Sequence, residues 1–135
     1  MNGRRDERGT SLTVFVATVV AALILMAGLV VDGGAQSTAA RRCEQVAAQA
    51  ARAASDAGAA ARAGGRRPDS AQMLAAAREV IAGSGVTGDA AVAGGAIRVR
   101  TQARVDTVFL SVIGVSSLGA EGEAEAVLLG PGEGS

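Results

Sequence analysis

A run of 23 residues, 9–31, contains no charged side chain and constrains the fold of this chain more than any other feature. As an α-helix the run would be about 34 Å long at about 1.5 Å per residue, enough to cross a hydrocarbon core of about 30 Å. Thr13 and Thr18 do not interrupt it, because their hydroxyls can bond back to helix carbonyls. The run therefore predicts a transmembrane helix, anchored by Leu12, Val16, Val20, Leu23, Leu25 and Leu29.

The uncharged run has two other interpretations. A buried core helix is disfavoured because the rest of the chain has too few large apolar residues to surround it. A cleaved signal peptide stays open as the alternative. Signal peptides normally have an apolar region of about 7–15 residues and an A-x-A-like cleavage site. Here the run is longer and is followed by Asp32-Gly33-Gly34, so we expect a retained anchor.

The arginines near the run predict its orientation. Arg4, Arg5 and Arg8 precede it, and no arginine follows before Arg41. The positive-inside rule then places residues 1–8, a basic flank, in the cytoplasm and the C-terminal part outside the cell membrane. Asp32 is expected at the outer interface rather than within the bilayer.

Composition excludes several function classes. The 13 basic residues are all arginine and are balanced by 13 acidic residues, with no histidine and one cysteine. Histidine-based catalysis and Cys/His zinc sites are therefore ruled out. The chain has two aromatic residues and zero net charge, so neither base stacking nor overall electrostatic attraction favours nucleic acid. We expect no enzyme activity, no cofactor, no metal and no small-molecule substrate.

Residues 32–65 are expected to form an Ala-rich amphipathic helix, ended by Gly64-Gly65. Small residues recur along one face at a 4-3 spacing, a helix-packing face comprising Ala39, Cys43, Val46, Ala50, Ala53 and Ala57. Two interpretations remain open. Either the face packs on helices of neighbouring subunits, or it supports the chain's own small sheet. Cys43 lies on this face and is expected to be a buried small hydrophobe, with a cross-link between two copies as the alternative.

Residues 66–129 are expected to form a small α+β domain outside the membrane. A second helix should run from Pro68 or Asp69 to Ala82, with Asp69 or Ser70 as its N-cap. Its expected apolar face comprises Met73, Leu74, Ala77, Val80 and Ile81. The adjoining motif Gly83-Ser84-Gly85-Val86-Thr87-Gly88 matches G-x-G-x-x-G but follows a helix and opens strands, so it does not indicate dinucleotide binding.

An antiparallel sheet is expected after this helix. Residues 96–105 alternate between apolar and polar, which is typical of a half-buried strand, and 89–93 should pair with it across Gly94-Gly95. A further strand near the C-terminus alternates alanine or glycine with Glu121, Glu123 and Glu125. Antiparallel pairing would set these glutamates opposite the arginines of 96–105 on one wet face. We interpret the three carboxylates as a solvated strand face rather than a metal or catalytic site.

Residues 106–115 form the most apolar stretch outside the uncharged run. The stretch is interpreted as a hairpin tip, a short helix or a lipid-facing loop. It either contacts the membrane surface or a partner, or belongs to the core. Residues 130–135, Gly-Pro-Gly-Glu-Gly-Ser, are expected to be a disordered tail.

The order of these parts resembles the TadE/TadG-like family, pseudopilin-like proteins of the Tad (Flp) pilus and secretion machinery. The resemblance is carried by Arg8-Gly9-Thr10-Ser11, the apolar helix ending Gly28-Leu29-Val30-Val31-Asp32-Gly33-Gly34, and the Ala-rich segment 47–54. It is carried further by the alternating strand, the apolar turn Thr107–Gly114 and the final strand of alternating alanine. It covers nearly the whole chain, and its first 60 residues are the more specific part. It implies a pilin-like α+β fold and a single-pass membrane protein that assists pilus assembly or secretion without catalysis.

The resemblance also has implications for processing and partners. Family members cleaved by prepilin peptidase carry glutamate at the fifth mature position after glycine, whereas here Gly9 is followed at that position by Val14. The chain is therefore closer to the unprocessed, TadG-like branch, as an accessory component rather than a bulk pilus subunit. The implied partners are membrane lipid and other pilus or secretion subunits, with a second copy of the chain as a further candidate. The alternative is a secreted or anchored envelope binding domain with 9–31 as a signal peptide.

Overall fold

The computed structural model describes residues 6–128, and their side chains from Gly9 onward. Its dominant element is one uninterrupted helix, α1 (Asp6–Ala63), of 58 residues. The uncharged run and the Ala-rich segment are thus parts of a single helix, which passes through Gly33 and Gly34 without a break. The predicted tail at 130–135 lies outside the described residues.

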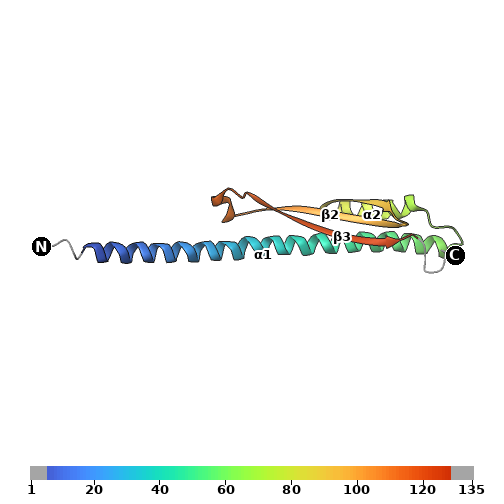
Figure 1. Cartoon of the computed structure of the whole chain (residues 1–135). Coiled ribbons are helices and arrows are strands. Elements are labelled where there is room, and N and C mark those ends of the chain that lie inside the picture. Colours follow the sequence, from blue (N-terminus) through green and yellow to red (C-terminus); the bar gives the residue numbers. More distant parts are fainter. Residues whose placement is uncertain (1–5, 129–135) are drawn as a thin grey trace.

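The remaining elements form a small layer along the C-terminal half of α1 (Figure 1). They are α2 (Ser70–Gly83), β1 (Thr87–Ala93), β2 (Ala96–Asp106), the short 3₁₀ helix η1 (Leu110–Ile113) and β3 (Ser117–Val127). The strands make one antiparallel sheet in the order β1-β2-β3. The fold is therefore α+β, as the sequence predicts.

Local chemistry explains where these elements begin and end. Asp69 is the N-cap of α2, where its side chain accepts a 2.9 Å hydrogen bond from the Ala71 amide. Gly94 and Gly95 both have positive φ, 58° and 75°, which is the requirement of a type I′ hairpin turn between β1 and β2. Gly114, with φ of 92°, ends η1 in the left-handed conformation.

The core lies between one face of the sheet and the two helices. α2 contributes Met73, Ala77 and Ile81, which are buried, with Leu74 and Val80 partly buried against them. The sheet contributes Ala90, Ile97, Val99 and Ala126, and α1 contributes alanines 47, 50, 51 and 54. Because most of these side chains are small, the core is thin and its layers are close together.

Candidate functional site

The N-terminal half of α1 projects beyond the sheet and α2 (Figure 1) and exposes large apolar side chains. The six predicted anchor residues are between 48% and 64% exposed: Leu12, Val16, Val20, Leu23, Leu25 and Leu29. Thr13 and Thr18 donate to the Gly9 and Val14 carbonyls, at 2.9 and 2.8 Å, so their hydroxyls are satisfied within the helix as expected. α1 is long and apolar enough to span a membrane.

The predicted topology arginines lie at the start of this half. Arg4 and Arg5 lie outside the described residues, and Arg8 is in the first turns of α1, where only its backbone is described. The orientation drawn from these arginines therefore stays a prediction.

A junction forms where the turn between β2 and β3 meets α1. Asp32, on α1, is 3% exposed and accepts hydrogen bonds from three consecutive backbone amides. These come from Val108 (2.9 Å), Phe109 (3.1 Å) and Leu110 (2.8 Å). Asp32 thus marks the end of the uncharged run, but it is covered by the turn and lies within a helix that continues for another 31 residues.

The amides control the charge state of Asp32. The hydrogen bonds from Val108 and Leu110, and more weakly that from Phe109, hold the pKa of the Asp32 carboxyl below its ordinary value, against the opposing effect of burial. The carboxylate is therefore ionised at neutral pH. Its role is to fix the turn to α1, since successive N–H groups that converge on one oxygen pair form a concave anion site.

Close packing at Gly28 supports the same junction. A Cβ built on Gly28 would lie 2.5 Å from the Phe109 Cβ, so only glycine allows this approach. Within the turn, the Thr107 hydroxyl donates to the Val115 carbonyl, and the Val115 amide donates to the Leu110 carbonyl at 3.0 Å. The turn is therefore closed on itself and attached to α1 at two positions one helical turn apart.

The predicted helix-packing face lies under the chain's own sheet and α2. Cys43, Val46 and Ala50 are buried, and the remaining members, Ala39, Ala53 and Ala57, are partly buried. The structure therefore favours the second of the two interpretations, in which the face supports the domain of the same chain. A neighbouring subunit would have to use other parts of α1.

Cys43 is at the closest approach between α1 and the sheet. A Cβ built on Gly122 of β3 would lie 2.6 Å from the Cys43 carbonyl oxygen. The Thr101 hydroxyl of β2 donates to that same oxygen at 2.8 Å, and the Cys43 thiol lies 3.7 Å from the Ala120 carbonyl oxygen. With an exposed fraction of 0%, Cys43 is the buried small residue that the sequence predicts, and a cross-link would require this contact to open.

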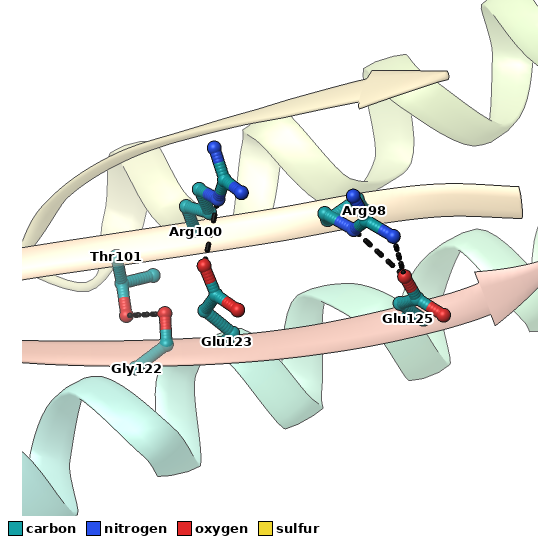
Figure 2. A network of polar contacts seen from close by, with 6 residues as sticks. All are labelled: Arg98, Arg100, Thr101, Gly122, Glu123 and Glu125. Atoms are coloured by element: carbon teal, nitrogen blue, oxygen red, sulfur yellow. Dashed lines mark hydrogen bonds and ion pairs between the residues drawn. The ribbon is translucent and has the colours of Figure 1, made fainter. Parts of the chain in front are cut away.

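The outer face of the sheet has paired charges (Figure 2). Arg98 contacts Glu125 at 2.5 Å and Arg100 contacts Glu123 at 2.7 Å, in the antiparallel register that the sequence predicts. Glu121 lies opposite Gln102. Within residues 9–128, no group of His, Cys, Asp and Glu is arranged to hold a metal ion. The Arg and Glu rows are the solvated strand face of the sequence interpretation.

The apolar stretch after β2 forms a turn with a short 3₁₀ helix, one of the structures considered from sequence. Val108, Val112 and Ile113 are exposed by 66%, 82% and 66%, so these side chains do not belong to the core. The contacts of this turn with Asp32 and Gly28 are not predicted from the sequence. A signal was available: Asp32 is the single acid adjoining a long uncharged run, and such a charge usually has a specific partner.

No family model, curated protein or solved structure matches this chain.

Proposed function

We propose that the chain is a single-pass membrane protein with its N-terminus in the cytoplasm and its α+β domain outside. The observation that carries the membrane anchor is the contrast within α1: its C-terminal half is covered by the domain, whereas residues 9–31 expose large apolar side chains. The proposed orientation rests on the arginines that precede the run, Arg4, Arg5 and Arg8. Soluble proteins rarely expose an apolar surface of this extent. A lipid bilayer covers such a surface along its full length.

Within the membrane we propose a non-catalytic accessory role in a pilus or secretion system of the Tad (Flp) type. Support comes from the TadE/TadG-like resemblance and from the architecture, in which one long helix carries a small antiparallel sheet. Since the small-residue face is occupied by the chain's own domain, helix packing with other subunits would use the exposed half of α1. The paired glutamates of the outer sheet face support a role without catalysis.

The junction disfavours the alternative of a secreted domain released by signal cleavage. Cleavage near residue 35 would remove both Gly28 and Asp32. The amides of 108–110 would then lose the carboxylate that accepts their hydrogen bonds. The turn would also lose the Gly28 contact with Phe109, so cleavage would remove both attachments of the turn to α1.

The first test is the N-terminal sequence and mass of the protein extracted from membranes. A start at Met1 or Asn2 supports the retained anchor, and a start at Thr10 indicates a processed pilin. A start after about residue 35, with the protein in the soluble fraction, would contradict the proposal and support the signal peptide.

The second test separates the anchor from the accessory role. The full chain, tagged at its C-terminus, should co-purify from mild detergent with the secretion ATPase and its membrane platform. A matched control replaces residues 9–27 with a leucine–alanine span of equal length, which keeps Gly28 and Asp32. Loss of the partners with this control supports recognition through the span. Recovery of the natural chain alone contradicts the accessory role and leaves the anchor intact.

A further inference from the structure

The turn between β2 and β3 exposes apolar side chains at its tip. This apolar loop, residues 107–115, leaves five of them at least 37% exposed: Val108, Phe109, Val112, Ile113 and Val115. Val112 is the most exposed, at 82%. Clusters of exposed apolar residues on a protein surface commonly mark sites of contact with a partner or a membrane.

The junction fixes the position of the apolar loop along α1. Phe109 packs on Gly28, and the amides of 108–110 bind Asp32. The loop therefore lies beside the last turn of the uncharged run, where Leu29, Val30 and Val31 are 60%, 75% and 52% exposed. Figure 1 shows the turn at the end of the sheet that faces the apolar half of α1. The two apolar surfaces are continuous.

Charged residues are absent from this level of the molecule apart from Asp32. Neither 9–31 nor 107–120 contains Asp, Glu, Arg or Lys. The Asp32 carboxylate, which would oppose burial in lipid, is 3% exposed and receives three amide hydrogen bonds. Charges resume only at Asp106 and Glu121 on the strands and at Arg41 on α1. The uncharged part of α1 and the uncharged end of the domain therefore stop at the same position along the helix axis.

The backbone of the apolar loop is also suited to an apolar environment. The amides of Val112, Gly114 and Val115 donate to carbonyls within the loop, at 3.2, 3.1 and 3.0 Å. The Ser111 hydroxyl donates to the Val108 carbonyl at 2.6 Å. In lipid, polar groups must be satisfied internally because water is not available to bond them. The cost of moving this loop out of water is lowered accordingly.

From the continuity, the charge boundary and the satisfied backbone, we infer that the apolar loop inserts into the outer interfacial layer of the membrane that α1 spans. This inference rests on the proposed membrane anchor. The chain then contacts the bilayer at two points, with α1 as the span and the loop as a second, shallow contact. Two contacts restrict both the tilt and the rotation of the helix, since turning α1 about its axis would withdraw the loop.

Tryptophan fluorescence tests the inference directly, because the chain has no Trp or Tyr. Three single variants of the full chain are compared in phosphatidylcholine–phosphatidylglycerol vesicles. Val112→Trp reports on the loop, and Leu23→Trp reports on the span. Val127→Trp is the matched control, since this valine is 66% exposed but lies at the end of the sheet away from the loop. Val112→Trp and Val127→Trp are measured with lipids brominated on the acyl chain near the headgroup, and Leu23→Trp with lipids brominated deep in the acyl chain, because bromine quenches only by contact.

The expected result is loss of emission by brominated lipid for Leu23→Trp and Val112→Trp, with no loss for Val127→Trp. Quenching of Leu23→Trp without that of Val112→Trp overturns loop insertion and leaves the anchor. A blue-shifted Val112→Trp emission without bromine quenching also overturns it, because protein, such as a second copy, then covers the loop. Absence of quenching at Leu23→Trp overturns the proposed anchor itself.

A second comparison tests the role of Asp32 in placing the loop. Asp32→Asn added to Val112→Trp should reduce the bromine quenching, because the amide cannot accept three hydrogen bonds as the carboxylate does. Asp56→Asn, an exposed acid on the same helix, is the control and should leave quenching unchanged. Equal quenching in both double variants would show that the loop reaches lipid without the Asp32 contact, which contradicts this part of the inference.

Discussion

The two halves of α1 have the same backbone conformation but opposite relations to the rest of the chain. The N-terminal half has the largest apolar side chains and exposes them, whereas the C-terminal half is rich in alanine and buries one face of it, including Ala47, Ala50 and Ala54. Burial within the chain thus does not follow the hydrophobicity of single residues. It follows shape, because small side chains let the sheet approach the helix backbone. The large apolar residues are left for an environment outside the chain.

Gly122 shows how strongly shape controls the buried half. The β3 backbone lies so near the Cys43 carbonyl that a single added carbon would overlap it. In the N-terminal half a comparable restriction is found at Gly28, at the junction, whereas at Gly33 and Gly34 an added Cβ would meet no atom within 4 Å. The difference between the halves therefore predicts opposite responses to the same kinds of substitution.

The largest effect is expected for a charge placed in the exposed half. Leu23→Arg should cost about 2.5–3.5 kcal/mol of membrane insertion if the side chain lies near the bilayer centre. The measurement is the fraction of full-length protein recovered in sedimented membranes after carbonate washing. Val127→Arg, at a 66% exposed site on β3, is the matched control and should stay in the membrane fraction. Equal partitioning of the two variants would contradict the membrane assignment of this half.

The next effect is expected for added volume in the buried half. Ala50 is fully buried, and Ala50→Leu should destabilise the domain by about 1–3 kcal/mol through overpacking. Urea unfolding in detergent, followed by circular dichroism, measures it. Two variants serve as controls: Gln49→Leu on the exposed face, and Ala22→Leu in the N-terminal half. The free energy of unfolding of each is expected to lie within about 0.5 kcal/mol of that of the natural chain. A neutral Ala50→Leu would show that the helix–sheet contact is loose.

Much of the fold was accessible from sequence because its signals are local. Each signal depends only on neighbouring residues: the lack of charge over 9–31, the alternation over 96–105 and the Gly94-Gly95 pair. The structure has the corresponding helix, strand and turn. The Arg and Glu rows also predicted the β2–β3 register, since opposite charges are favoured across strands. Boundaries shifted by only one to three residues.

The junction could not be predicted in the same way. Asp32 and Val108 are 76 residues apart, and no local pattern links them. Likewise, the 4-3 spacing of small residues showed a packing face but not what packs on it. The sheet of the same chain packs on this face because Gly122 allows close approach to α1 and the Thr101 hydroxyl bonds to the Cys43 carbonyl. The topology arginines and the pilus role remain predictions.

A smaller and more local effect is expected at the junction. The pKa of Asp32 in the folded protein lies below its ordinary value of 3.8. The contribution of the Asp32 carboxylate to folding stability is therefore complete at neutral pH and is lost as the pH falls through the lowered pKa. NMR in micelles should show the amide shifts of 108–110 titrating together with a midpoint below 3.8. In Asp32→Asn the same amides should exchange faster with deuterium and show no such titration. A midpoint above 3.8 would contradict the geometry described for this carboxylate.

The smallest effect is expected on the outer sheet face. Arg100 and Glu123 are 68% and 63% exposed, so their pair should contribute about 0.2–1 kcal/mol. A double-mutant cycle with Arg100→Ala and Glu123→Ala, followed by urea unfolding at low and high salt, measures the coupling. The coupling should weaken with salt. A larger, salt-insensitive value would indicate that this face is shielded from water.

The absence of a break at Gly33-Gly34 has a mechanical consequence. From Asp32 to Ala63 the helix extends about 48 Å at about 1.5 Å per residue, and the sheet is fastened along much of that length. The N-terminal half of α1 and the domain are therefore expected to move together as one rigid body. Under the proposed topology, a few degrees of tilt inside the bilayer would displace the distal end of the domain by several ångströms, so that a force on the membrane-spanning part would move the domain on the other side.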